Sequence, residues 1–167
     1  MSEQRQEDAV DRILAQWHQE RPDLDVGPMA IIGRLSRSAA LMSRQLELAF
    51  SQFGMTAWEF DVLATLRRSG APYCLAPTAL FSTLMITSGT MTHRLKSLEN
   101  SGWIERLANP EDARSMLVKL TPAGLQLIEQ AAEAHVANQQ RILANLSPQQ
   151  REQIDASLRL LLAQLEP

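Results

Sequence analysis

Apolar residues recur at helical spacing through most of the chain. Near the start, four of them fall at i, i+3, i+4 and i+7 and so share one helix face: Val10, Ile13, Leu14 and Trp17. Pro22 ends this helix, because the residue before a proline is pushed out of the α region. Similar spacing predicts three longer helices: residues 28–53, residues 122 to nearly 145, and residues 148 to near the C-terminus.

The middle of the chain predicts shorter elements. Thr56 and Glu59 have the spacing of a capping box, so a helix is expected to begin there and to end at Ser69-Gly70. A short helix over residues 77–83 and a second one over Ser88–Asn100 follow. Three apolar residues form the inward stripe of the second helix: Met91, Leu95 and Leu98. Two short helices joined by a brief polar turn predict a helix-turn-helix.

A β-hairpin is predicted directly after these helices. Trp103–Leu107 and Met116–Leu120 read as two strands around the charged loop ANPEDARS. The predicted fold is mainly α with a small β-hairpin wing, a winged helix-turn-helix with N- and C-terminal dimerisation helices. Within one compact domain, we expect an extra N-terminal helix and a dimerisation helix in residues 1–53, the DNA-binding region in 54–121, and C-terminal dimerisation helices in 122–167. Their apolar faces exceed what a small winged helix can bury, which favours a homodimer.

Composition narrows the class of protein. The chain has 167 residues, is 45% hydrophobic and carries a net charge of −3, as expected of one ordinary domain. Residues 86–119 nevertheless carry a net charge of +1. The sequence has no long apolar run and no basic, apolar leader, so we expect a cytoplasmic protein. The single Cys74 and the dispersed histidines argue against a metal site. Because the sequence shows no nucleophile–base cluster and no phosphate-binding loop, we do not expect an enzyme.

The face of Ser88–Asn100 opposite its apolar stripe is polar, and this suits the DNA major groove. The candidate base-contacting residues are Ser88, Thr90, Thr92, His93, Lys96 and Ser97. In the hairpin, Arg114 is the candidate for a minor-groove contact, and Asp112 for an ion pair that orients it. The alternatives are an ordinary solvated helix face and a surface turn charge.

The stretch SGTMTHRLKSLENSGWIERLANPEDARSMLVKLTPAGLQLI resembles the MarR family of winged helix-turn-helix repressors. The wing pattern of this family is met by Asp112, Ala113, Arg114 and Ser115, followed by LTPAG. Many members have a second arginine where Ala113 stands, so the wing contact is left to Arg114. The resemblance implies an obligate homodimer on double-stranded DNA, at a pseudo-palindromic operator with half-sites about one helical turn apart.

The stretches WHQERPDLDVGPM and WEFDVLATLRRSGAPY resemble a narrower branch, the PecS and HucR group, which responds to urate. That resemblance implies four ligand-binding residues: Trp17, Asp61, Arg68 and Arg106. Asp61 and Arg68 are seven residues apart, so they share a helix face about 10 Å apart along the axis and can flank a flat molecule. Arg67, beside Arg68, leaves this assignment open by one residue.

The function expected is that of a ligand-responsive DNA-binding regulator. It would act as a repressor without a cofactor and leave its operator on binding a small anionic aromatic effector, urate or a related purine. Xanthine, a phenolic compound or oxidation at Cys74 are alternative signals, although an apolar setting favours Cys74 and His135 as packing residues. A rival class is a winged-helix protein-interaction module without specific DNA binding.

Overall fold

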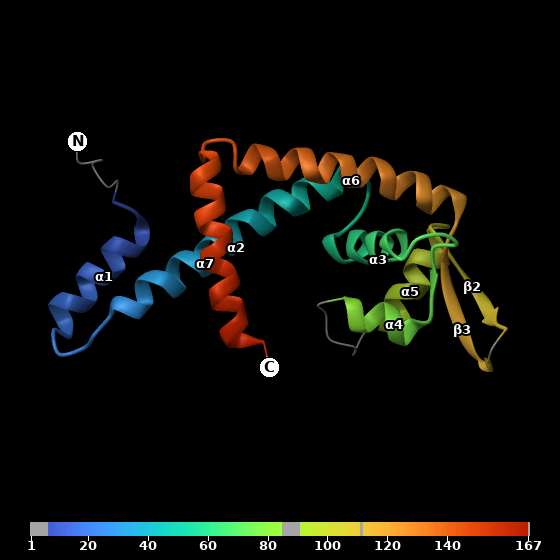
Figure 1. Ribbon diagram of the computed structural model, residues 1–167, viewed down its shortest axis with the longest axis horizontal. Coiled ribbons are helices and arrows are strands. Elements are labelled where there is room, and N and C mark those ends of the chain that lie inside the picture. Colours follow the sequence, from blue (N-terminus) through green and yellow to red (C-terminus); the bar gives the residue numbers. More distant parts are fainter. Residues whose placement is uncertain (1–6, 85–90, 111, 167) are drawn as a thin grey trace. The chain divides into compact units, whose positions relative to one another are not determined.

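The computed structural model describes residues 7–84, 91–110 and 112–166; the side chains of residues 91, 92 and 112–114 are outside the description. The chain divides into two compact units, Met1–Gln45 and Leu46–Pro167, and each is described by itself (Figure 1). None of the helices in the described ranges has the length and hydropathy that a membrane span needs.

The N-terminal unit consists of α1 (Ala9–Glu20) and the first part of α2 (Gly27–Ser51). The Asp8 carboxylate caps α1 by accepting hydrogen bonds from the backbone N–H groups of Val10, at 2.7 Å, and Asp11, at 3.0 Å. Arg34 of α2 donates to Asp8 at 2.8 Å and to Asp11 at 2.6 Å. Gly33 lets the helices approach closely, because a Cβ there would lie 3.3 Å from a methyl group of Val10. Ion pairs and one tight contact therefore join α1 to α2.

The second unit contains the last part of α2 and five more helices: α3 (Ala57–Arg68), α4 (Pro77–Thr83), α5 (Met91–Asn100), α6 (Pro122–Ile142) and α7 (Pro148–Leu165). The expected capping box is present at α3, where the backbone N–H and the hydroxyl of Thr56 each donate to the Glu59 carboxylate at 2.8 Å. Thr121 and Ser147 cap α6 and α7, each followed by proline at the first helical position.

The sheet has three antiparallel strands in the order β1-β3-β2: β1 (Cys74–Leu75), β2 (Ile104–Asn109) and β3 (Asp112–Leu120). Strands β2 and β3 form the predicted hairpin, which is longer than expected and has an irregularity in register at Ala108/Asn109. Strand β1 was not predicted: Cys74 pairs with Lys119 there, because β3 offers its free edge.

The core of this unit gathers apolar side chains from its helices and from strands β2 and β3. Its fully buried members include Leu63, Leu66, Leu80, Leu98, Ile104, Val118 and Ile128. The first turn of α6 approaches β2 so closely that a Cβ on Gly124 would lie 1.9 Å from the backbone oxygen of Trp103. The winged helix-turn-helix is thus packed around its own interior, and the predicted fold class is confirmed.

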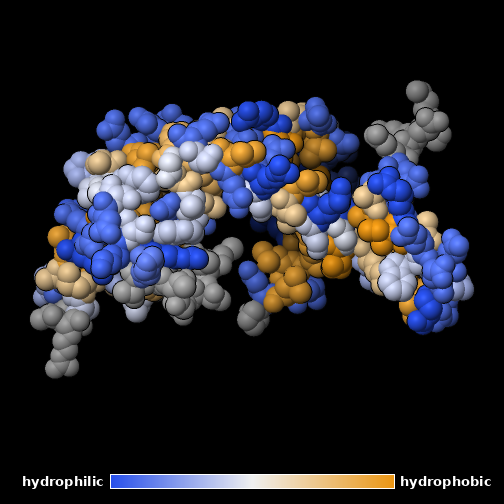
Figure 2. Space-filling model, turned by 180° about the vertical axis from the view of Figure 1, so that it is seen from behind, coloured by the Kyte–Doolittle hydropathy of each residue, from blue (hydrophilic) through white to orange (hydrophobic). Residues whose placement is uncertain are grey.

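The helices near the two ends of the chain, in contrast, leave many apolar side chains exposed. No side chain of α7 is buried, and Leu160 and Leu165 are 73% and 71% exposed. Figure 2 shows hydrophobic side chains gathered on this helix toward the C-terminus. In the N-terminal unit Ile31 and Ile32 of α2 are 65% and 54% exposed. These helices carry apolar surface that the described chain leaves in contact with solvent.

Candidate nucleic-acid interface and effector site

Helix α5 presents its polar face outward as predicted. Leu95 and Leu98 are buried, His93 and Lys96 are exposed, and Ser97 is half-buried. Two further candidates, Ser88 and Thr90, lie outside the described residues, as does the side chain of Thr92. The described part of the helix therefore offers an imidazole, an ammonium group and a hydroxyl to a partner.

The wing is the hairpin of β2 and β3. Its backbone is described at Asp112 and Arg114, which belong to β3, but their side chains are not, so the proposed minor-groove contact and its supporting ion pair stay predictions. Near the tip Asn109 pairs with Asp112, and the Asn109 amide donates to the Ser115 hydroxyl at 2.8 Å. This bond ties the two strands together next to the position of Arg114.

Charged side chains join α5 to its neighbours at two places. Glu99, near the end of α5, forms an ion pair of 3.3 Å with Arg106 of β2. Nε, which forms this ion pair, and Nη2 of Arg106 are buried, and within the part of the chain that the structure describes neither has a partner with hydrogen-bond geometry. Closer to the start of α5, the guanidinium of Arg94 lies over the ring of Trp58 in α3, 5.1 Å from its centroid. The sequence analysis identified Arg106 as a candidate ligand residue but did not identify its contact with α5.

Asp61 and Arg68 both lie on α3, as predicted. The Asp61 side chain reaches solvent, yet desolvation by the groups around it raises its pKa, while the charges of Arg68 and His135 act in the opposite direction. Arg68 donates to the hydroxyl of Thr65 at 2.7 Å. Among the described contacts the two groups form no ion pair, although the charge of Arg68 acts on Asp61.

The two neighbouring arginines of α3 make different contacts. Arg67 pairs with Glu129 of α6 at 2.5 Å, and its guanidinium lies 5.1 Å from the centroid of the Tyr73 ring. Arg68 instead donates a hydrogen bond to Thr65, and its charge acts to lower the pKa of Asp61. Since Arg67 already has two partners, Arg68 is the better placed of the two for a ligand.

A cavity of about 370 Å³ opens beside Arg68, a volume within the range of small-molecule sites. Its walls come from α3, β1 and α4: Thr65, Arg68, Ser69, Leu75, Ala79 and Thr83. Of these wall residues only Arg68 was predicted from the sequence, since Leu75 and Thr83 are brought to α3 only by the tertiary fold. Hydroxyl groups and one guanidinium on an otherwise apolar wall suit a small anion with a flat body.

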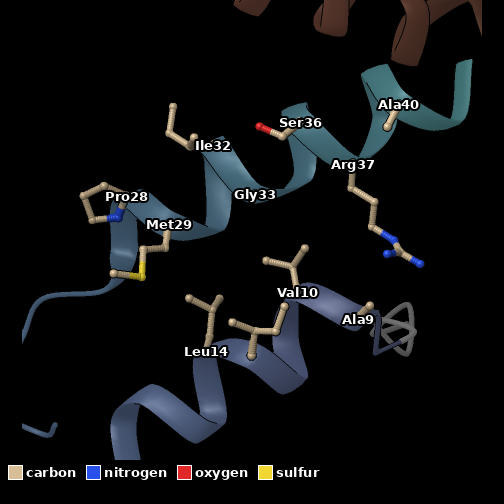
Figure 3. Close-up of a pocket in the computed structure, with 11 residues that line it drawn as sticks. Ala9, Val10, Leu14, Pro28, Met29, Ile32, Gly33, Ser36, Arg37 and Ala40 are labelled. Carbon is tan, nitrogen blue, oxygen red and sulfur yellow. The ribbon is translucent and has the colours of Figure 1, made fainter. Parts of the chain in front are cut away.

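Trp17, the fourth predicted ligand residue, belongs to the N-terminal unit, where it is 39% exposed. Since each unit is described by itself, Trp17 has no described position relative to Asp61. A pocket of about 750 Å³ forms a groove between α1 and α2 (Figure 3). Val10 and Leu14 rise from α1 toward α2, and Arg37 extends from α2 near one end. Trp17 is not among the residues that line this groove.

Cys74 and His135 are both half-buried, each with charged groups near it. Burial raises the pKa of the Cys74 thiol; Lys119 lowers this pKa and Glu105 raises it. The His135 ring stacks on Phe50 with centroids 5.2 Å apart, and burial lowers its pKa while Asp61 raises it. At neutral pH, the thiol is therefore protonated and the imidazole is neutral. Within the described ranges, no three His, Cys, Asp or Glu side chains gather as a metal site would require.

Comparison with known proteins agrees with this architecture. The sequence model of the MarR family matches residues 55–116, from the start of the helix-turn-helix into the wing. The HTH-type transcriptional regulator PecS of Dickeya dadantii is 45% identical over 149 residues, which are 89% of this chain and 90% of PecS. The chain belongs to the MarR family. As a member it is a DNA-binding transcription regulator and not an enzyme, which confirms those two predictions.

Other MarR proteins extend the comparison. The multiple antibiotic resistance protein MarR of Salmonella typhimurium is 42% identical over 87 residues, 52% of this chain and 58% of that protein. The crystal structure of a mutant MarR from Escherichia coli, complexed with operator DNA, has a TM-score of 0.69 and 31% identity and covers 85% of this chain and 98% of that one. AbsC of Streptomyces coelicolor, with a TM-score of 0.75 at 22% identity over 85% of this chain and 96% of its own, shares the fold.

Proposed function

We propose that the protein is a homodimeric repressor that binds a pseudo-palindromic operator and releases it when a small, flat, anionic effector of the urate class binds beside α3. The observation that carries the effector half is the arrangement of Asp61, Arg68 and the adjoining cavity on a helix packed against the DNA-binding elements. The protein would act in the cytoplasm, where its DNA is.

The DNA half of the proposal follows from the outer surface of the second unit. His93 and Lys96 stand exposed on α5, and the hairpin beside them carries Arg114 in its sequence. A helix of this kind reads base edges in the major groove, while an arginine on a wing can enter the adjacent minor groove. The E. coli MarR relative crystallised on operator DNA supports the same use of this fold.

Dimerisation is supported by the unpartnered terminal helices. The exposed apolar residues of α7 follow helical spacing: Ile154, Leu158, Leu162 and Leu165. The α1–α2 groove is lined almost wholly by apolar side chains (Figure 3). Two copies related by a two-fold axis would cover such surfaces and set the two recognition helices at the half-site spacing of a palindromic operator.

The effector half rests on matched chemistry. The carboxylate of Asp61 accepts hydrogen bonds from ring N–H groups, and the guanidinium of Arg68 binds an anionic edge with two parallel bonds. Urate and related purine anions offer both. Trp17 is proposed as a further ligand residue, and Arg106 is proposed to carry the signal, because it is ion-paired with Glu99 of α5. An anion that attracts Arg106 would weaken that pair and change the position of the recognition helix.

The test is the affinity of the purified protein for the intergenic DNA upstream of its own gene, at one fixed salt concentration, with and without urate. We expect urate to weaken binding by about tenfold or more, a usual size for allosteric coupling. Asp61→Asn and Arg68→Gln should retain DNA binding and lose the response. Xanthine and salicylate, tested in parallel, identify a related purine or a phenolic effector.

Arg67→Gln is the matched control, because it removes an equal charge from the adjacent position while leaving Arg68 in place. It should respond to urate as the parent does. If urate, xanthine and salicylate all leave the parent unchanged, the effector site is wrong although the regulator stands. If Arg67→Gln and Arg68→Gln lose the response equally, the assignment of Arg68 is wrong.

A further inference from the structure

The recognition helix α5 carries one arginine that its polar outer face does not explain. Arg94 follows His93 directly, yet it is half-buried while His93 is exposed. Its guanidinium lies 5.1 Å from the centroid of the Trp58 ring, on the first turn of α3. The flat face of an indole attracts a guanidinium strongly, and partial burial strengthens this attraction. Arg94 therefore points back into the protein rather than outward.

The positions around α5 show what this contact can do. Advancing 100° per residue, Arg94 lies about 70° to one side of the centre of the buried stripe made by Leu95 and Leu98. Glu99, which is paired with Arg106, lies about 70° to the other side. The Arg94–Trp58 contact on one flank and the Glu99–Arg106 ion pair on the other resist rotation of the helix about its axis. The two buried leucines alone would resist this rotation only weakly.

We propose that Arg94 is a positioning residue for DNA binding: through Trp58 it fixes the rotation of α5 and so directs His93 and Lys96 at the bases, without itself contacting a phosphate. The pair joins the first turn of α3 to the first half of α5, two helices between which β1 and α4 lie along the chain. A change of a few degrees in this rotation would move the outward side chains relative to base edges that require defined geometry. The proposal concerns DNA binding alone and is independent of the effector.

The test uses the full-length protein and a duplex selected from random sequence by the parent protein, with a mixed-sequence duplex of equal length as the nonspecific probe. Arg94→Gln and Trp58→Leu should each weaken binding to the selected duplex by about three- to tenfold, as loss of a partly buried cation–π contact implies. The double variant should be no weaker than either single one, since both remove the same contact. Affinity for the mixed-sequence duplex should change less than twofold.

The slope of affinity against salt concentration separates positioning from phosphate binding. A phosphate contact contributes about one unit to the slope on logarithmic axes, and a positioning residue contributes none. We expect the slope of Arg94→Gln to equal that of the parent. Arg94→Lys should recover most of the specific affinity, because an ammonium group also binds over an aromatic ring.

The proposal is overturned if Arg94→Gln lowers the slope by about one unit and weakens both duplexes alike, or if Trp58→Leu leaves specific binding unchanged. Should Trp58→Leu fail to fold, Trp58→Phe supplies the second arm, because it keeps an apolar ring and offers a weaker cation–π face. Trp58→Phe should then have a smaller effect that disappears in the Arg94→Gln background. An effect that is the same in both backgrounds would mean that Trp58 acts only through core packing.

Discussion

The two units of the chain differ in how far they bury their apolar residues. The second unit has a core that joins α3, α5, α6 and the sheet, and each buried residue of this core is less than 10% exposed. In the N-terminal unit only Val10 and Val26 are buried among the described apolar residues, and α1 is held to α2 largely by Arg34 and two carboxylates. The DNA-reading part of the second unit is thus stabilised from within, whereas the N-terminal unit and α7, the outer helix of the second unit, depend on a partner copy in our proposal.

The largest effect is expected from a change in the interior of the second unit. Gly124→Ala would place a Cβ 1.9 Å from the Trp103 backbone oxygen, so α6 and β2 must separate. We expect the free energy of unfolding to fall by about 3 kcal/mol. Urea denaturation at fixed protein concentration measures this change. Ala123→Ser, at the exposed neighbouring position, is the control, and an equal loss of stability in both variants would contradict the role of the close approach.

The second test addresses the dependence on a partner copy. Leu158→Glu places a charge in the exposed apolar stripe of α7 and should weaken dimerisation by about 100-fold, the size expected of a central interface residue. Sedimentation equilibrium measures the dissociation constant. Ala156→Glu adds the same charge on the opposite face of α7 and should leave the dimer intact. A Leu158→Glu protein that stays as dimeric as the parent would show that this stripe is not the interface.

The smallest effect concerns the ion pairs of the N-terminal unit. Hydrogen bonds from the backbone and from Arg34 lower the pKa of Asp8 and of Asp11 below 3.8. A carboxyl group with a lowered folded-state pKa stabilises the fold above its unfolded value, and this contribution is lost as the pH falls through the folded value. The attachment of α1 should therefore weaken below about pH 3.8.

Backbone amide NMR signals of α1, followed from pH 5 downward, measure this loss. Arg34→Gln removes the shared partner, so its α1 signals should already differ from the parent at pH 5 and should change less on acidification. Identical titrations in parent and variant would show that Arg34 does not hold α1.

Local sequence signals predicted the helices well. Thr56 and Glu59 form the expected capping box, and the short helix α4 occupies residues 77–83 as predicted. Strand β1 escaped prediction because two residues are too few to show alternation, and Cys74 becomes a strand only by pairing with Lys119. A local sequence pattern can predict elements whose hydrogen bonds are local, such as helices. It cannot predict a short strand that forms only by pairing with the edge of a strand far away in the sequence.

The candidate sites divide in the same way. Helical spacing alone predicted that His93 and Lys96 face outward, while the polar ligand residues came from resemblance to a family. What separates Arg67 from Arg68 is a pairing with Glu129, 62 positions away, and what occupies Arg94 is Trp58 on another helix. Neither contact has a signature in one sequence, because side chains far apart along the chain meet only in the folded structure.

The most direct measurement is a footprint of the purified protein on the intergenic DNA upstream of its own gene, at fixed salt, with and without urate. The account predicts protection of two half-sites about one helical turn apart, lost as urate is added. Protection that urate leaves unchanged would contradict the proposed effector, and the absence of any sequence-specific protection would contradict the operator-binding repressor itself.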